Sequence, residues 1–247
     1  MKLSNIVAFA QQIAPFETAA EWDNIGLLVG SPEWETDRVL LALDITPDVV
    51  EEACEKGAKL IISHHPVIFS PLHALRPDHA AYLLAKYDIA ALCLHTNLDR
   101  AEKGVNTALG AALGLKNTIL YPDDFLLVGE PVEPCSAERF AAFIKEKLRA
   151  PSVRYTEGTV TRVAVSSGGG GEGVELAAQY GFDAFVTGEM KHHQYLYATQ
   201  HRIAAFDAGH FSTEDVVIAP LKDKFAAAFP TVEFLISEAN PCPYRAV

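Results

Sequence analysis

The sequence predicts an α/β protein of two pseudo-duplicated halves, each with a mixed, largely parallel sheet flanked by helices. Three observations lead to this expectation. Apolar, strand-like runs alternate with amphipathic helical runs. The order of helix, glycine and strand in the first half returns in the second, and several strands run into histidines or carboxylates. We expect a single unit whose halves cover about residues 1–123 and 124–247, intertwined at a dinuclear metal site between them.

Composition is typical of a globular, soluble protein. The 247 residues are 49% hydrophobic and 21% charged, which is enough apolar material for a substantial core. The formal net charge of −12 argues against a nucleic-acid binder that works through its overall field, although it leaves a local basic patch open. No apolar run reaches membrane-spanning length, so we expect a cytoplasmic protein with no membrane partner.

The cysteines indicate reduced thiols rather than a disulfide framework or a zinc finger. They are scattered, without C-x-x-C spacing, at Cys54, Cys93, Cys135 and Cys242. Cys54 falls in a predicted helix and Cys93 in a predicted strand, where small buried thiols are usual.

The first helix is expected to begin with Ser4 as its N-cap and to stop at Pro15. Apolar residues recur between them at helical spacing: Ile6, Val7, Phe9, Ala10 and Ile13. In the following segment, Trp22 and residues 27–29 are interpreted as core, and Asp23, Asn24 and Gly26 as a turn. For that segment taken alone, a structural turn before a strand is the favoured interpretation.

A β-α-β unit follows. A strand over 39–45 leads to Thr46 and Pro47, which suit the N-cap and first residue of a helix over 48–56 that ends at Gly57. The next strand, 59–63, should therefore lie parallel to the first. A helix over 77–87 and a strand over 89–94 continue the pattern.

Two adjacent histidines, His64 and His65, follow the apolar strand and precede Pro66, which cannot extend a sheet ladder. Ligands of open α/β sheets bind at the carboxyl ends of strands, which makes this pair a candidate site. The alternative for an isolated pair is a turn with two solvated histidines.

The second half contains predicted strands over 126–132 and 159–165, with an amphipathic helix over 136–148 between them. Residues 168–171 are four consecutive glycines between a strand and a helix. Their backbone N–H groups can bind a phosphate, but the run lacks the lysine of a P-loop, and a flexible turn is slightly favoured.

Residues 175–189 align without a gap on 51–65. Gly181 falls on Gly57 and Glu189 falls on His65, and residues 203–208 correspond in the same way to 89–94. We interpret this as an internal duplication. The alternative is that the two segments are similar only because both follow the common pattern of βαβ units. A pseudo-twofold arrangement of the halves would bring four strand ends to one cleft.

His210 and Glu214 follow the last of these strands, at the expected start of a helix near residues 211–212. Their spacing places both side chains on one helix face, where a histidine and a carboxylate are common metal ligands. The alternative is a capping histidine with a glutamate favoured by the helix dipole.

His64, His65, Asp99, His210 and Glu214 supply three imidazoles and two carboxylates. This set suits two divalent metal ions that share ligands, and zinc, iron or manganese better than calcium or magnesium. His95, Glu189, His192 and His193 are further candidates for proton transfer.

Five separated motifs carry a resemblance to the NIF-three family, whose members are catalogued as GTP cyclohydrolase 1 type 2 homologues. They are Trp22–Leu27, Ser63–Pro66, His95–Asp99, Thr187–Glu189 and Gly209–Glu214. The chain resembles the short form, which has no inserted domain. The resemblance implies two α/β halves, a dinuclear site with ligands at His64, His65, Asp99, His210 and Glu214, and a homohexameric ring. Glu214 is our hypothesis for the bridging carboxylate, and His192 and His193 are candidates for contact with the substrate or for support of the ligands.

The favoured function is a metal-dependent hydrolase that acts on a nucleotide or a phosphorylated small molecule through a metal-bound hydroxide. The family name suggests ring opening of a purine nucleotide, and phosphoester hydrolysis is equally open. The alternative is a non-enzymatic, metal-binding hexameric scaffold or regulatory protein. A ring that handles DNA is a third candidate, disfavoured by the charge of −12.

Overall fold

The computed structural model describes residues 1–247 and divides them into two compact units. The first unit contains residues 1–101 and 218–241, and the second contains 102–217 and 242–247. The units are therefore not consecutive halves of the chain. Residues 218–241 return to the first unit after the main part of the second, and residues 242–247 return to the second. None of the helices is long and apolar enough to cross a membrane.

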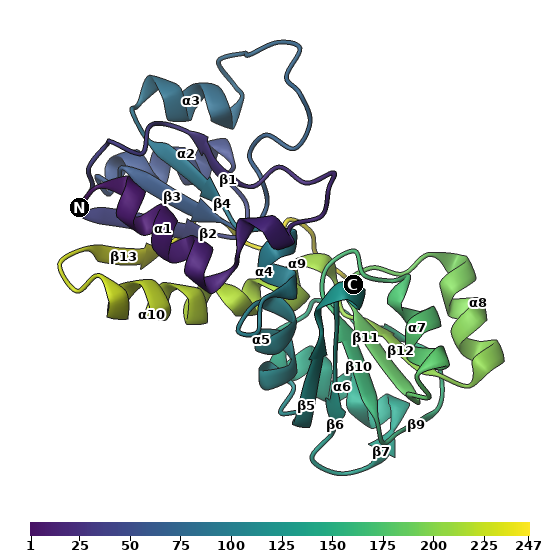
Figure 1. Ribbon diagram of the computed structural model, residues 1–247. Coiled ribbons are helices and arrows are strands. Elements are labelled where there is room, and N and C mark those ends of the chain that lie inside the picture. Colours follow the sequence, from purple (N-terminus) through teal and green to yellow (C-terminus); the bar gives the residue numbers. More distant parts are fainter. The chain divides into compact units, whose positions relative to one another are not determined.

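The first unit is built around a five-stranded sheet of order β1-β4-β3-β2-β13 (Figure 1). Strands β13, β2, β3 and β4 are parallel, and β1 is antiparallel at the edge. The elements are α1 (Leu3–Ile13), η1 (Phe16–Thr18), β1 (Gly26–Val29), β2 (Arg38–Ala42), α2 (Pro47–Glu55), β3 (Leu60–Ser63), α3 (Ala80–Lys86), β4 (Ala90–Cys93), α4 (Thr96–Arg100), α10 (Ile218–Ala228) and β13 (Glu233–Ile236).

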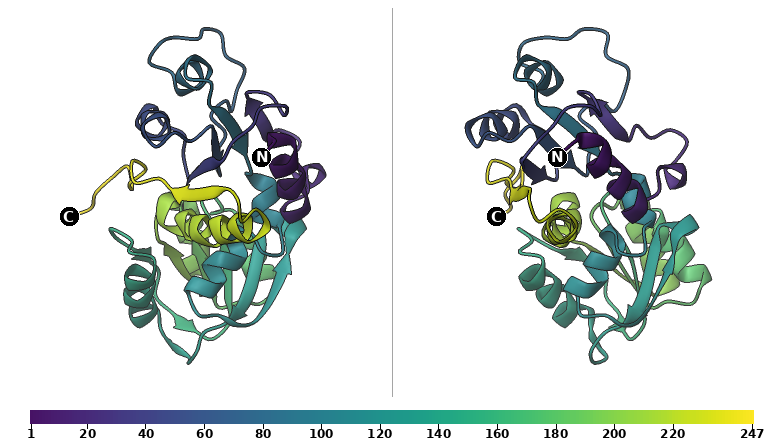
Figure 2. Two further views of the ribbon diagram at one scale, coloured as in Figure 1. Left: turned by 90° about the vertical axis from the view of Figure 1, so that its left-hand side faces the viewer. Right: turned by 60° about the vertical axis from the view of Figure 1, so that its left-hand side comes forward.

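Helices cover both faces of this sheet. Figures 1 and 2 show α2 and α3 on one face and α1 and α10 on the other. Val49 and Leu84 pack from the first pair of helices against Leu40 and Ile61 of the sheet. On the other side, the rings of Phe9 and Phe225 meet edge to face with their centroids 5.3 Å apart. The central strands are buried on both faces, which explains their unbroken apolar sequences.

The second unit contains a six-stranded sheet of order β5-β6-β10-β11-β12-β8, together with the small ribbon β7-β9. Strands β10, β11 and β12 are parallel to one another. On either side of them, β6 pairs antiparallel with β10, and β8 pairs antiparallel with β12. The elements are α5 (Val105–Ala112), β5 (Lys116–Tyr121), η2 (Pro122–Asp124), β6 (Leu126–Glu130), β7 (Cys135–Ser136), α6 (Ala137–Lys147), β8 (Arg154–Tyr155), β9 (Thr159–Val160), β10 (Val163–Ser166), α7 (Gly173–Gln179), β11 (Ala184–Thr187), α8 (His192–His201), β12 (Ala204–Asp207), α9 (His210–Glu214) and η3 (Asp215–Val217).

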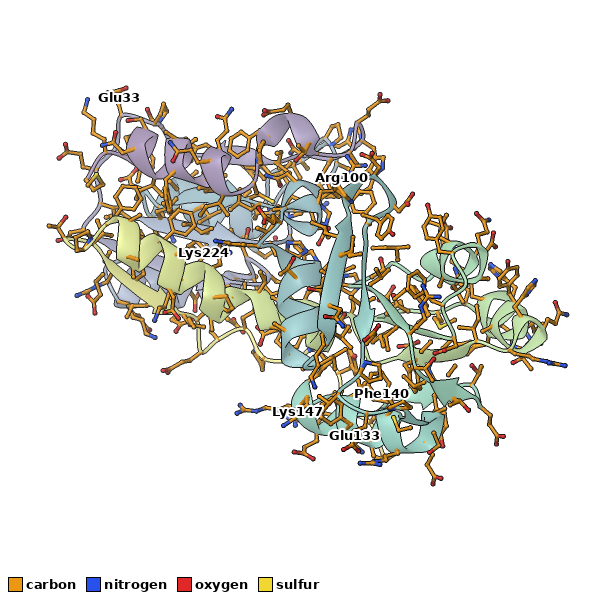
Figure 3. The ribbon with its side chains drawn as sticks, turned by 60° about the horizontal axis from the view of Figure 1, so that its bottom comes forward. Glu33, Arg100, Glu133, Phe140, Lys147 and Lys224 are labelled. Atoms are coloured by element: carbon orange, nitrogen blue, oxygen red, sulfur yellow. The ribbon has the colours of Figure 1, made fainter.

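Two apolar clusters hold this second sheet. Phe140 of α6, labelled in Figure 3, packs with Ile144 against Val165 and Phe206 on one face. Val174 of α7 and Ala198 of α8 pack on the other face, with Phe185 of the sheet. The strands between them are therefore buried on both sides.

The same connectivity recurs in both units. The run β2-α2-β3-α3-β4 has a counterpart in β10-α7-β11-α8-β12, and the three strands of each run are parallel. Gly57 and Gly181 end the equivalent helices with φ of +71° and +73°, a conformation that glycine adopts without a steric penalty. The helix, glycine and strand order predicted from the sequence is present in both units.

Several local predictions need correction. Helix α1 begins at Leu3, so Ser4 lies inside it and Lys2 occupies the N-cap position. The predicted strand 159–165 is two strands, β9 and β10. Cys54 is exposed, because its position on α2 faces away from the sheet, whereas Cys93 is buried as expected. Trp22 is not a core residue, since 63% of its surface is exposed.

Candidate metal-binding groups

Three histidines gather at the carboxyl ends of β3 and β4 in the first unit. These strands are parallel and pair Ser63 with Cys93, so the residues that follow them emerge at the same edge. The ring centroids of His64 and His65 lie 5.0 Å apart, and that of His95 lies 5.1 Å and 5.6 Å from them. Each imidazole offers a nitrogen within 4.8 Å of the others, which is close enough for all three to bind one metal ion.

Each of these imidazoles is held through Nδ1. His64 Nδ1 lies 2.9 Å from the carbonyl oxygen of Leu94, His65 Nδ1 lies 2.7 Å from Asp44 Oδ1, and His95 Nδ1 lies 2.8 Å from Asp23 Oδ1. A carbonyl oxygen only accepts, so Nδ1 of His64 carries the hydrogen and donates it. Imidazoles that bind metals are oriented in this way, with the second nitrogen left for the ion.

Asp99 stands beside the first of these histidines. His64 is fully buried, and its Nε2 lies 3.7 Å from Asp99 Oδ1 on helix α4. Because Nδ1 donates to the Leu94 carbonyl, Nε2 is the nitrogen that faces this carboxylate oxygen. An imidazole nitrogen and a carboxylate oxygen are both common ligands of divalent metal ions.

A second group lies in the other unit. His210 occupies the first position of α9, with its Nε2 3.0 Å from Glu214 Oε2 one turn along the helix. Its Nδ1 lies 3.1 Å from Glu189 Oε1, beyond the end of β11. Glu214 is buried, whereas Glu189 is mostly exposed. The predicted partnership of His210 and Glu214 on one helix face is therefore present, and Glu189 orients the imidazole from the far side.

Glycines let the backbone approach this second group. Gly168 has φ of +55°, and a Cβ at this position would overlap Glu214 Oε1 and lie 3.0 Å from His210 Nε2. Its N–H donates to Thr213 Oγ1 at 3.1 Å, and the N–H of Gly170 donates to the Ser167 carbonyl. These donors are used within the protein, which favours the predicted turn over a phosphate cradle for residues 168–171.

Asp23 links the first histidine group to the turn before β1. It accepts hydrogen bonds from His95, from the Thr96 N–H and from the Thr96 hydroxyl. Burial alone would raise the pKa of this carboxyl, but these hydrogen bonds and the neighbouring imidazole lower its pKa to about 2. The turn predicted from the sequence is therefore also a support for His95.

Exposed aromatic rings border the same group. Trp22 and Phe69 lie with their ring centroids 6.2 Å and 6.3 Å from that of His95, and 5.9 Å from each other. Both side chains are more than half exposed.

Two of the predicted residues belong to neither group of possible metal ligands. His192 and His193 occupy the exposed first turn of α8. Sequence reasoning also missed Asp44 as a support for His65. Its role follows from the strand register, because Asp44 follows β2 by the same two residues by which His65 follows β3, and these strands pair Ala42 with Ser63.

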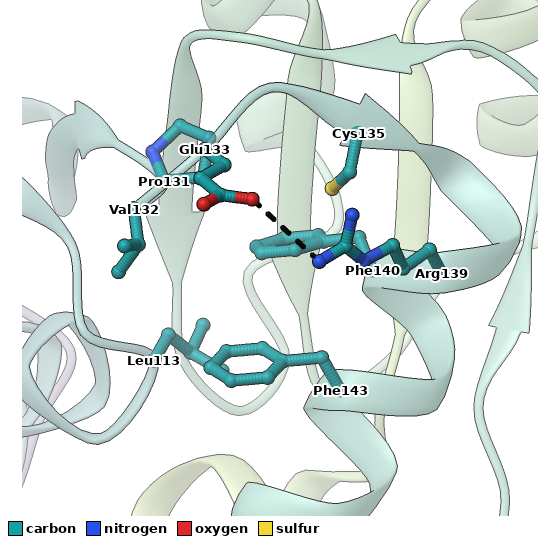
Figure 4. Close-up of a pocket in the computed structure, with 8 residues that line it drawn as sticks. All are labelled: Leu113, Pro131, Val132, Glu133, Cys135, Arg139, Phe140 and Phe143. Carbon is teal, nitrogen blue, oxygen red and sulfur yellow. Dashed lines mark ion pairs between the residues drawn. The ribbon is translucent and has the colours of Figure 1, made fainter.

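An apolar pocket in the second unit shares no residue with either histidine group. It has a volume of about 330 Å³ and is lined by Leu113, Pro131, Val132, Glu133, Cys135, Arg139, Phe140 and Phe143 (Figure 4). Glu133 and Arg139 form an ion pair across it at 3.7 Å. The rings of Phe140 and Phe143 are stacked with centroids 6.0 Å apart. With one thiol and a solvent-exposed ion pair as its polar groups, this pocket contains no comparable set of metal ligands.

Comparison with known proteins shows that the chain belongs to a known protein family. The family described as Duf34/NIF3 (NGG1p interacting factor 3) matches residues 1–243. A Streptomyces coelicolor protein named GTP cyclohydrolase 1 type 2 homolog is 34% identical over 86% of this chain and 81% of its own length. A Clostridium acetobutylicum protein of the same name is 29% identical over 99% of this chain and 98% of its own. The crystal structure of a Staphylococcus aureus protein superposes with a TM-score of 0.92, at 31% identity, over 100% of this chain and 99% of that one.

Proposed function

Because the chain belongs to the Duf34/NIF3 family and contains clustered histidines that could hold a metal ion, we propose that it is a hydrolase dependent on two divalent metal ions. The proposed ligands are His64, His65, Asp99, His210 and Glu214, and the proposed ions are zinc, iron or manganese. The proposed substrate is a nucleotide or another phosphorylated small molecule. The names of the relatives support this choice, since they are called homologues of a GTP cyclohydrolase.

The observation that carries the proposal is the orientation of His64. Its Nδ1 donates to the Leu94 carbonyl, and its Nε2 faces Asp99 inside a fully buried position. An imidazole nitrogen and a carboxylate oxygen that face each other are donor atoms of the kinds that divalent metal ions bind in proteins. His65 and His210 are held through Nδ1 in the same manner.

When bound, a pair of divalent ions supplies Lewis acidity and lowers the pKa of water. The protein's own contribution is orientation and proton transfer. His95 and Glu189 are our candidates for the proton-transferring groups, because each lies beside a proposed ligand without being assigned as one. His192 and His193 remain proposed contacts for the substrate.

Metal titration of chelator-treated protein tests the proposal directly. We expect tight binding of zinc, manganese or ferrous iron, and at least a hundredfold loss of affinity in Glu214→Ala and His64→Ala. His201→Ala is the matched control, because His201 is an exposed histidine at the end of α8 that stacks on Tyr197. Equal metal affinity in the wild type and both ligand variants would refute the assignment.

Turnover is tested with GTP, other nucleotides and phosphodiesters, each assayed with each metal by mass spectrometry. Product formation that Glu214→Ala abolishes supports the hydrolase. Metal binding without any turnover supports the second candidate, a metal-binding scaffold, which the family description as an interacting factor favours. Assembly into a homohexameric ring belongs to the same proposal, and light scattering should then give six times the chain mass of 26.8 kDa.

A further inference from the structure

A polar cavity of about 290 Å³ in the second unit borders His210. Its lining includes Ser152, Arg154, Glu189, Asp207 and Tyr244, together with the backbone of two glycines. The cavity is large enough for a small polar ligand, though close to the lower limit of ligand-binding pockets. Its composition, rich in hydrogen-bond donors, indicates what that ligand can be.

Arg154 contributes the only guanidinium or ammonium group of this lining. The arginine side chain is 67% exposed, and it forms an ion pair with Asp207, which is only 5% exposed. Its guanidinium carbon also lies 5.5 Å from the ring centroid of Tyr195. Arg154 is therefore held by a buried carboxylate and an aromatic face while the rest of its charged group meets solvent.

Asp207 is engaged by several donors. Besides Arg154, it accepts hydrogen bonds from the Met190 N–H at 3.1 Å, the Tyr195 hydroxyl at 3.0 Å and the Gly209 N–H at 3.3 Å. This carboxylate is thus a support for the arginine rather than a free acceptor in the cavity. The hydrogen bond to Asp207 uses Nη2, and a guanidinium has five N–H donors, so donors remain for an anion.

Two hydroxyl groups extend the donor set. Ser152 is exposed at the cavity, and the Tyr244 hydroxyl lies so close to Gly209 that a Cβ there would overlap it. Burial, together with Cys242, Asp207 and Glu189, raises the pKa of Tyr244, which keeps its hydroxyl protonated at neutral pH. Glu189 opposes an anion, but it lies 3.1 Å from Nδ1 of His210 and is mostly exposed.

We propose that this cavity binds the phosphate group of a ligand, and that Arg154 is the residue that determines this specificity. A planar guanidinium held on one side by Asp207, with hydroxyl donors in the same lining, matches the hydrogen-bonding geometry of a phosphate. The inference rests on the proposed function, since it identifies the phosphorylated part of the substrate as the part bound beside His210. It extends that function by naming a recognition residue that the metal ligands do not include.

The test is a titration of the full chain with inorganic phosphate, followed by ³¹P NMR, both after chelator treatment and with metal added. Arg154→Gln should weaken phosphate binding at least tenfold in both states, and Arg154→Lys should fall between this variant and the wild type. Tyr244→Phe removes one hydroxyl and should weaken binding by a smaller factor. Arg162→Gln is the matched control, because Arg162 lies over the ring of Phe182 in the same unit and outside the cavity.

Acetate serves as the second probe, and thermal melting shows that each variant is folded. Wild-type phosphate affinity in folded Arg154→Gln would overturn the inference, as would acetate binding equal to that of phosphate. If Arg154→Gln does not fold, unchanged phosphate affinity in both Arg154→Lys and Tyr244→Phe would overturn the inference.

Two outcomes distinguish this site from the proposed function. Phosphate binding that depends on Arg154 in a protein that binds no metal would refute the proposed hydrolase and keep this site. Metal binding and turnover without dependence on Arg154 would refute this site alone.

Discussion

His65 and Asp44 meet through a contact of 2.7 Å between Nδ1 of the imidazole and Oδ1 of the carboxylate. Asp44 is itself fixed, because Asn240 donates to its other oxygen at 3.3 Å. The aspartate thereby fixes the orientation of the His65 ring, so that Nε2 points away from Asp44. The orientation of His65 thus depends on a residue that follows the neighbouring strand β2.

Removing this support should weaken metal binding without removing a ligand. We expect Asp44→Ala to lower zinc or manganese affinity by about 10- to 100-fold, because His65 loses its fixed orientation. Competition with a chromophoric chelator measures the affinity. Asp48→Ala is the control, since Asp48 is exposed in the first turn of α2. If the two variants bind metal with equal affinity, the contact between Asp44 and His65 does not contribute to metal binding.

Asp23 should make folding stability depend on acid pH. Its pKa is lowered from 3.8 to about 2 in the folded protein, so its contribution is fully present above about pH 4 and is lost as the pH falls toward 2. The contribution is on the order of 2 kcal/mol. Urea unfolding of wild type and Asp23→Asn at several pH values should show a difference that shrinks through this range. A difference in stability of the same size at pH 2 and pH 5 would contradict the role of Asp23. Glu21→Gln is the control, because Glu21 is an exposed residue of the same segment, and this variant should show no such pH-dependent difference from the wild type.

The glycine run offers a pair of matched variants. Gly168→Ala introduces a Cβ that overlaps Glu214 at a backbone φ of +55°, whereas a Cβ on Gly169 has nothing within 4 Å. We expect Gly168→Ala to lose more than about 1 kcal/mol of stability and much of its metal affinity. Gly169→Ala should keep its metal affinity. Calorimetry of unfolding and of metal binding checks both, and similar results for the two variants would show that the loop adjusts freely.

The cysteines should differ sharply in reactivity. Burial, with Asp23 and Asp99 nearby, raises the pKa of the Cys93 thiol, and Cys54 is exposed on α2. Mass spectrometry after iodoacetamide treatment should find Cys54 modified in the native protein and Cys93 modified only in denaturant. Native labelling of Cys93 at a rate comparable to that of Cys54 would show that β4 opens readily.

Sequence reasoning located the elements that carry local signals. Thr46 and Pro47 do begin α2, with the threonine hydroxyl accepting from the Val49 N–H. Both signals act within one turn of helix, so they can be read without knowledge of the fold. The apolar strands 60–63 and 184–187 were equally visible, because both of their faces are buried.

What escaped prediction depends on contacts between segments far apart in the chain. The role of Asp44 becomes visible only when the register of β2 and β3 is known, and the pairing of Arg154 with Asp207 joins residues 53 positions apart. Trp22 was interpreted as core because its side chain is large and apolar, yet its ring lies beside His95 on an exposed surface. Hydrophobicity alone does not distinguish a ring that fills the interior from one placed at a site.

The return of residues 218–241 to the first unit has a consequence for biosynthesis. Strand β13 pairs with β2 along the outer edge of the first sheet, but it is translated after every strand of the second sheet. In the nascent chain, the edge of β2 therefore stays unpaired while β5 to β12 are synthesised. An unpaired strand edge can form hydrogen bonds with a wrong strand. The sheet whose synthesis starts first is completed last, so premature termination beyond residue 217 would leave an intact second sheet attached to an unfinished first one.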